Sequence, residues 1–136
     1  MSLIQLTSAT RPFGFDSASL AGILVAARRC NARDGITGAL ICRNDLYLQL
    51  LEGPSDEVES AYRRIRRDDR HVEVRLLTRH VVADDARLFG RWAMHDDPAA
   101  SWIWTRDQVD DGAVERASVD EVMAVFNRLS GELAAA

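Results

Sequence analysis

Two short apolar runs separated by three residues constrain the fold of this chain more than any other feature. They cover residues 36–42 and 46–51, and only Arg43-Asn44-Asp45 lies between them. A polar tripeptide between two β-compatible runs predicts a β-hairpin. Gln49 lies inside the second run, where a buried amide costs about 1–3 kcal/mol unless a hydrogen bond satisfies it. We therefore expect a polar group of the protein, or of a ligand, against this hairpin.

Length and composition favour one globular domain, and its histidines and tryptophans form no evident catalytic or metal-binding constellation, so an enzyme is not expected. A chain of 136 residues can bury a hydrophobic core without disulfides or a structural metal, and 28% charged residues is ordinary for such a domain. The net charge of −4 argues against nucleic-acid or anionic-membrane partners. The start of the chain resembles no signal peptide, and no apolar run reaches about 18 residues, so a cytoplasmic location is expected. Cys30 and Cys42 are then free thiols.

A local basic cluster interrupts this acidic balance. Five arginines fall within eight residues: Arg63, Arg64, Arg66, Arg67 and Arg70. Four of them belong to one predicted helix, so a solvated helix face explains them, and contact with an anion or phosphate is the alternative.

Periodicity along the chain predicts an α+β fold. Period-two and apolar stretches indicate strands, and apolar residues spaced every three or four positions indicate helices. The predicted order is strand 3–8, helix 19–33, the hairpin, a helix from about 55, strand 72–79, a turn-and-helix stretch 84–90 and strand 91–95. This βαββαββ order is the ferredoxin-like pattern, with two helices on one face of the sheet.

The chain changes character after Pro98. The apolar residues between 118 and 133 recur at helical spacing and predict a C-terminal amphipathic helix. We therefore divide the chain into a domain over 1–97 and a helical extension over 98–136. Because two helices on one face leave the other face uncovered, we expect the extension to pack there or to form a subunit interface.

Five motifs in order resemble the BLUF family, whose members are flavin-binding blue-light sensor domains. The motifs are Asn31-x3-Gly35-Ile36-Thr37-Gly38-Ala39-Leu40, Tyr47-Leu48-Gln49-x-Leu51-Glu52-Gly53, Tyr62-x-x-Ile65, Asp68-x-Arg70-His71 and Phe89-x-x-Trp92-x-Met94. The resemblance covers about residues 3–96. It implies a non-covalent flavin, FAD or FMN, between the two helices on the sheet.

The resemblance also implies roles for individual residues. Asn31 would hydrogen-bond the polar edge of the flavin ring, and Gln49 would be the amide whose hydrogen bonds switch under light. Trp92 and Met94 would report that change to the C-terminal helix.

Further flavin contacts follow from the same motifs. Arg64 and Asp68 would contact the flavin from the second helix, with Arg70 and His71 near the same end. Ile23 would belong to the apolar lining, together with Leu24, Leu40, Ile41 and Leu51. The simpler alternative for all the lining residues is ordinary core packing.

The chain departs from the family on its first strand. BLUF domains present a tyrosine there that gives an electron and then a proton to the excited flavin. Aligning Leu3-Ile4-x-Leu6-x-Ser8-Ala9 on that strand places Gln5 at the tyrosine position, and no tyrosine precedes Tyr47. An amide is not oxidised by an excited flavin, so we expect Gln5 to face Gln49 in the site and the usual light reaction to be impaired or absent.

Two function classes remain open on the residues alone. In the first, the chain is a sensory domain that binds flavin and signals to a separate protein effector, as a homo-oligomer. In the second, it is a flavin-free interaction module, in which Gln49 bonds to Gln5 and Asn31 only caps a helix. A hydrolase of the acylphosphatase type is excluded, since residues 9–16 carry no basic, glycine-rich phosphate loop.

Overall fold

The computed structural model describes residues 3–12, 29–43, 46–67, 71–83, 87–96 and 104–135. Its strands are β1 (Leu3–Pro12), β2 (Thr37–Arg43), β3 (Leu46–Pro54), β4 (His71–Val82) and β5 (Trp92–Asp96). Its helices are α2 (Ser55–Arg67), α3 (Arg106–Asp110), α4 (Ala113–Arg116) and α5 (Val119–Ala135), and residues 29–34 are also helical. None of the described helices is both long and apolar enough to cross a membrane.

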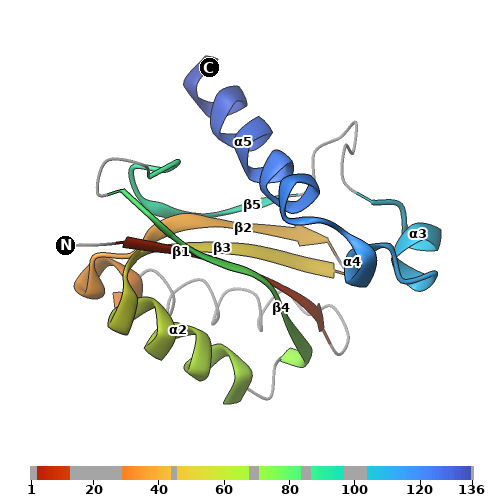
Figure 1. The fold of residues 1–136 in the computed structure, drawn as a ribbon, viewed down its shortest axis with the longest axis horizontal. Helices are drawn as coiled ribbons and strands as arrows, with labels where there is room; N and C mark the ends of the chain where they lie inside the picture. The colour runs from red at the N-terminus through yellow and green to blue at the C-terminus, as the bar shows by residue number, and fades with distance from the viewer. Residues whose placement is uncertain are drawn as a thin grey trace.

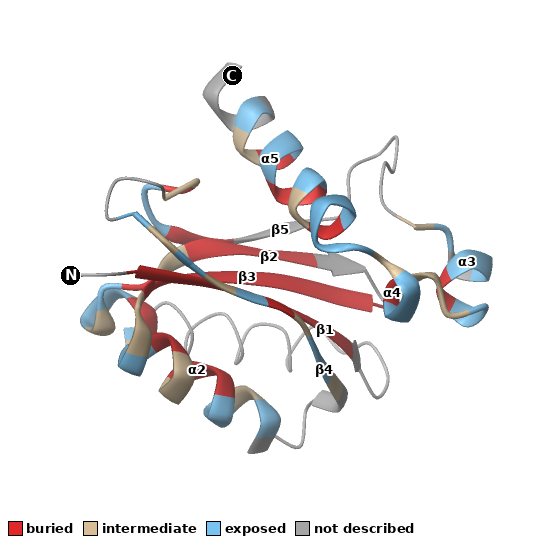
Figure 2. Ribbon diagram, viewed as in Figure 1, coloured by how far each residue is buried: buried red, intermediate tan, exposed pale blue. Residues whose placement is uncertain are grey.

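The five strands form one mixed sheet in the order β4-β1-β3-β2-β5 (Figure 1). The predicted hairpin is present, and β2 pairs with β3 antiparallel. β1 lies between β3 and β4 and pairs antiparallel with both, whereas β5 runs parallel to β2. β3 is therefore the central strand, and its residues 46–53 are all buried (Figure 2).

The two faces of the sheet carry separate apolar clusters. Because side chains alternate along a strand, Tyr47 and Leu51 of β3 lie on one face, whereas Leu48 and Leu50 lie on the other. The first pair packs with Val58 and other residues of α2. The second pair packs with α5, whose Phe126 is fully buried. We call these the α2 face and the α5 face.

The helices α2 and α5 thus cover opposite sides of the sheet, as Figure 1 shows. α5 packs against the sheet through residues of the α5-face cluster. Val109 of α3 and Val114 of α4 join the same cluster. Burial of the apolar stripe of α5 explains why this segment folds onto the domain.

Three sequence expectations are corrected by the structure. β1 extends to Pro12, beyond the predicted end of the strand at residue 8, because its pairing with β4 continues to His71. Residues 87–91 form bends with no helix, although a turn-and-helix stretch was predicted over 84–90. The short helices α3 and α4 were not predicted; α3 begins with a capping box between Thr105 and Gln108.

Candidate functional site

Gln49 lies in the middle of the central strand on the α2 face. It pairs with Ser8 of β1 on one side and with Leu40 of β2 on the other. The residue is only 8% exposed. Within the described part of the chain, no hydrogen bond reaches its side chain. An amide on a buried residue that makes no hydrogen bond to any described residue is a group that a ligand can satisfy.

Asn31 is a second buried amide of the same kind. It lies in the helical residues 29–34 and is 4% exposed. The backbone carbonyl of Asn31 accepts a hydrogen bond from Ile36 N at 2.9 Å, which closes the end of this helix. The side chain takes no part in that closure and has no hydrogen bond to any described residue. The hydrogen bond that closes this helix is therefore made by the backbone of Asn31 and not by its side-chain amide.

A cavity of about 660 Å³ opens beside Asn31, between the end of this helix and the edge of the sheet. Its described wall includes Asn31, Ile36, Thr37, Arg87, Phe89 and Trp92. Trp92 is 6% exposed, and its indole Nε1 is buried without a hydrogen-bond partner among the described residues. An apolar wall with a few unsatisfied polar groups has the composition of a small-molecule site.

Gln5 does not belong to this site, and the prediction that it faces Gln49 is wrong. Gln5 pairs with Glu52, which is three residues after Gln49 on β3 and therefore points to the opposite face. Its amide nitrogen donates to Glu52 Oε2 at 3.1 Å, and its Oε1 accepts from His80 Nε2 at 2.9 Å. The one-residue shift is invisible in the sequence, because both Gln5 and Leu6 are buried.

The β1 side chains that share the α2 face are Ile4, Leu6 and Ser8. Leu6 pairs with Leu51, so it is the diagonal neighbour of Gln49 across the two strands. A diagonal neighbour lies about 7–8 Å away, a distance that an aromatic ring spans. Leu6, and not Gln5, therefore occupies the place from which a β1 side chain would reach the Gln49 amide.

Glu52 is a buried polar residue to which the sequence analysis gave no role. Its carboxylate is fully buried and accepts four hydrogen bonds. The donors are Gln5 Nε2 at 3.1 Å, Thr37 Oγ1 at 3.0 Å, Leu88 N at 2.9 Å and Phe89 N at 2.8 Å. The sequence signal that could have revealed Glu52 is an acidic residue that directly follows the apolar run of this strand and precedes Gly53.

Arg87 reinforces the same junction from the cavity side. Its Nη1 donates to Thr37 Oγ1 at 2.8 Å and to the backbone carbonyls of Gly35 and Glu52 at 3.0 and 3.1 Å. The segment that precedes β5 is thus fixed to β2 and β3 by side-chain hydrogen bonds, in place of a helix.

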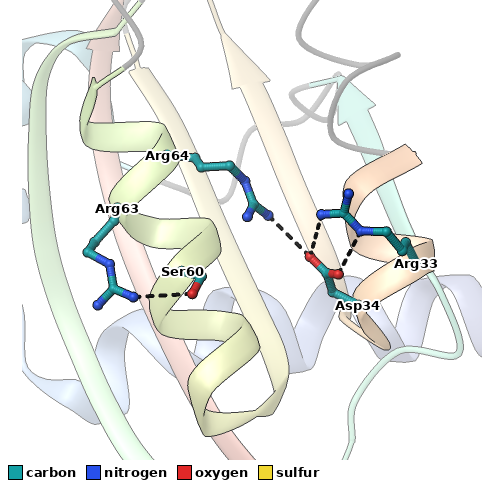
Figure 3. A network of polar contacts seen from close by, with 5 residues as sticks. All are labelled: Arg33, Asp34, Ser60, Arg63 and Arg64. Atoms are coloured by element: carbon teal, nitrogen blue, oxygen red, sulfur yellow. Dashed lines mark hydrogen bonds and ion pairs between the residues drawn. The ribbon is translucent and has the colours of Figure 1, made fainter.

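Arg64 lies on the exposed side of α2 and reaches across to Asp34 (Figure 3). The distance from Arg64 Nη2 to Asp34 Oδ2 is 3.4 Å, and Arg33 Nε lies 2.9 Å from Asp34 Oδ1. The hydrogen bond from Arg33 lowers the pKa of Asp34, with a smaller contribution from Arg64. In this structure Arg64 links α2 to the helical residues 29–34.

The remaining predicted site residues are placed only in part. Ile23, Asp68 and Arg70 lie outside the described residues, as does Leu24. His71 begins β4 and Met94 pairs with Leu40 in the strand register, but only their backbone is described. Ile41 packs in the α5-face cluster, so its predicted place in the flavin lining is wrong, whereas Leu40 and Leu51 lie on the α2 face.

Comparison with known families identifies one match. The family model for BLUF, described as sensors of blue-light using FAD, matches residues 1–95. Among curated proteins, the photoactivated adenylate cyclase subunit beta of Euglena gracilis is 39% identical over 93 residues. That alignment covers 68% of this chain and 10% of the relative, so the chain spans about a tenth of that protein.

Solved structures agree with the fold. The dark-state structure of BlrB, a BLUF protein, is 28% identical with a TM-score of 0.73, covering 96% of this chain and 97% of that one. Klebsiella pneumoniae BlrP1 with FMN and cyclic diGMP is 26% identical with a TM-score of 0.65, covering 97% of this chain and 34% of that one. The predicted α+β, ferredoxin-like fold is thereby confirmed.

Proposed function

Because this chain belongs to the BLUF family of flavin-binding blue-light sensors, we propose that it holds FAD non-covalently on the α2 face of its sheet. FMN is the alternative flavin. The observation that carries the proposal is the pair of buried amides, Asn31 and Gln49, neither of which has a hydrogen-bond partner in the described chain. BLUF domains are sensory modules, and the proposed function is accordingly regulatory.

The residues present fit the flavin ring. The ring has two flat apolar faces and one rim of hydrogen-bond donors and acceptors. Leu40, Tyr47 and Leu51 supply buried apolar surface on the α2 face. Asn31 and Gln49 supply amides that both donate and accept, and Trp92 Nε1 supplies a buried donor. This combination satisfies both the faces and the rim.

The protein's part in sensing rests on Gln49. When bound, a flavin absorbs blue light and accepts an electron from an oxidisable neighbour. An amide responds to such a change, because its two ends exchange donor for acceptor when it turns. Gln49 is buried on the central strand, so its reorientation would alter contacts with β1 and β2 without exposure to water.

The same site lacks the family's tyrosine. Leu6 takes the place from which a β1 side chain reaches Gln49, and an aliphatic side chain gives no electron to an excited flavin. We infer that the usual photocycle is absent in this chain and that the site reports flavin occupancy or flavin redox state.

The finer parts of the site and its output rest on the motifs. We include Asp68, Arg70, His71 and Ile23 as further flavin contacts and Met94 as a partner of Trp92 in signalling. We propose a protein effector as the partner, because relatives named photoactivated adenylate cyclase subunits share this domain. A homo-oligomer that presents α5 is the proposed assembly.

Reconstitution with FAD tests the proposal. The purified protein, incubated with excess FAD and passed through a desalting column, should keep the yellow flavin absorption. Asn31→Ala should weaken binding by about 1–3 kcal/mol, since flavin rim atoms then lose a partner in a dry site. Asn127→Ala, an exposed amide on α5, is the matched control and should bind FAD as the wild type does.

A specific observation favours one alternative. Position 6 carries leucine, which an excited flavin does not oxidise. A flavin-free interaction module of the same fold would have no need of an oxidisable residue there. Wild-type protein that retains no FAD and gives no heat in a calorimetric titration would overturn the flavin proposal and favour that module.

A further inference from the structure

One short segment lies between the cavity and the C-terminal helix. Phe89 and Trp92 line the cavity beside Asn31. Phe89 also packs in the α5-face cluster, which includes Phe126 and Leu129 of α5. A molecule in the cavity would therefore contact the segment 87–92 on one side, while α5 contacts the same segment on the other.

Hydrogen bonds fix this segment at both sides. The Glu52 carboxylate accepts from the amides of Leu88 and Phe89 at 2.9 and 2.8 Å. The carbonyl of Leu88 accepts from Ser130 Oγ of α5 at 2.8 Å. The backbone of Leu88 thus links the two groups: its N–H bonds to the buried carboxylate on the central strand, and its C=O bonds to the hydroxyl on α5.

The carboxylate belongs to the strand that carries Gln49, three residues further along. Glu52 follows Leu51 directly on β3, and Leu51 shares the α2 face with Gln49. Backbone amides bonded to an ionised acceptor form the stronger class of hydrogen bond. Because all four donors surround a fully buried group, a shift of β3 or of the segment 87–92 must break bonds or move both together.

We propose that Glu52 and Ser130 form a latch that couples occupancy of the cavity beside Asn31 to the docking of α5. This inference rests on the proposed function for its ligand, and it adds the route and the residues of the output. In the closed latch, Glu52 holds Leu88 and Phe89, and Leu88 holds Ser130; in the open latch, α5 separates from the segment. A ligand that packs against Phe89 and Trp92 favours the closed state, and α5 docking strengthens ligand binding by the same factor.

Amide hydrogen exchange measured by mass spectrometry, with and without FAD, tests the latch. In the wild type, FAD should slow exchange both at residues 87–92 and along α5. Ser130→Ala should keep the protection of residues 87–92 and lose that of α5. It should also raise the dissociation constant for FAD about fivefold, at the low end of typical coupling. Asn127→Ala, one turn earlier on α5, should behave as the wild type.

Glu52→Gln probes the other end of the latch. It keeps the size of the side chain but sets an NH₂ group against a backbone N–H, so exchange at Leu88, Phe89 and α5 should rise together even without FAD. Glu57→Gln, an exposed acid on α2, is the matched control. If Glu52→Gln does not fold, the exchange rates and the dissociation constant of Ser130→Ala decide whether the latch exists.

The outcomes separate the latch from the flavin proposal. FAD-dependent protection of α5 that persists in Ser130→Ala, with an unchanged dissociation constant, overturns the latch while flavin binding stands. If the wild type binds no FAD, the function proposal fails. The latch is then decided by ligand-free exchange: an unchanged rate along α5 in both variants overturns it, and a joint rise supports it.

Discussion

Gln5 and Gln49 lie on opposite faces of the sheet, although their strands β1 and β3 are hydrogen-bonded neighbours. The side chain of Gln5 forms hydrogen bonds with Glu52 and His80 on the α5 face, whereas Leu6 shares the α2 face with Gln49. The strand that should carry an electron donor for the flavin therefore presents leucine, and this relationship gives the first prediction.

Leu6→Tyr should create a light response that the wild type lacks. Wild-type protein loaded with FAD should stay fluorescent and show no reversible red shift of its flavin band under blue light. In Leu6→Tyr, a phenol stands within reach of Gln49, so part of that shift should appear. Because the larger ring overpacks a buried site at a cost of about 1–3 kcal/mol, circular dichroism must first show that the variant folds.

Gln5→Tyr is the matched control for that experiment. Its ring would lie on the α5 face, away from Gln49, and should create no red shift. A robust, reversible shift in the wild type would contradict the prediction and assign electron donation to Tyr47 or Trp92, two of the three buried aromatic residues of the α2-face cluster.

Asp34 should titrate at lower pH than an ordinary aspartate. Its ordinary pKa is 3.8, and the Arg33 hydrogen bond lowers the pKa in the folded protein. The ionised form is therefore favoured by folding: this contribution to stability is present above about pH 3.8 and is lost as the pH falls through the lowered pKa. A carboxyl-carbon NMR titration measures the pKa directly.

The Asp34 titration has an internal comparison. Arg33→Gln should raise the pKa of Asp34 more than Arg64→Gln does, because the hydrogen bond from Arg33 is the largest cause of the lowered pKa. The reverse order, or no change in either variant, would refute this assignment. High salt should reduce both effects, because both arginines are exposed to solvent and ions screen their charges.

Gly38→Ala should destabilise the fold strongly. Gly38 has a φ of 142°, and a Cβ there would lie 2.0 Å from the backbone oxygen of Leu50 on the paired strand. Backbone strain and overpacking together predict a loss of at least about 2 kcal/mol in the free energy of unfolding. Urea denaturation monitored by circular dichroism measures it.

Gly131→Ala provides a control of opposite sign. Gly131 lies in α5, and nothing stands within 4 Å of an added Cβ. Alanine should stabilise this helix by about 0.5–1 kcal/mol. Equal effects of the two substitutions would show that the close approach at Gly38 is not what requires glycine.

Phe126→Ala should test the packing of α5 on the sheet. Phe126 is fully buried in the α5-face cluster with Leu48 and Leu50 of β3. Its truncation leaves a cavity and should lower the free energy of unfolding by about 3–5 kcal/mol. Asn127→Ala, on the exposed side of the same helix, should change it by less than about 0.5 kcal/mol. A small effect of Phe126→Ala would mean that α5 is not anchored to the sheet.

The sequence by itself determined the strand and helix order over most of the described chain. Period-two alternation and helical spacing depend on which residues are apolar, and the polar break at 43–45 placed the hairpin. Gln49 stood out for the same reason, because an amide inside an apolar run is anomalous in any fold. The motifs then identified the family, because their residues and their order along the chain are specific to it.

Only the tertiary structure decided which face each strand residue takes. Moving one residue along a strand reverses the face, and the register of β1 is set by its partners β3 and β4, which no local pattern contains. For this reason Gln5 was misplaced by one position and Ile41 was assigned to the wrong face. The segment 87–91 likewise takes its bent form from hydrogen bonds to Glu52, 35 or more residues away in sequence. Long-range partners, which local propensity does not encode, fix these features and the latch that they form with Ser130.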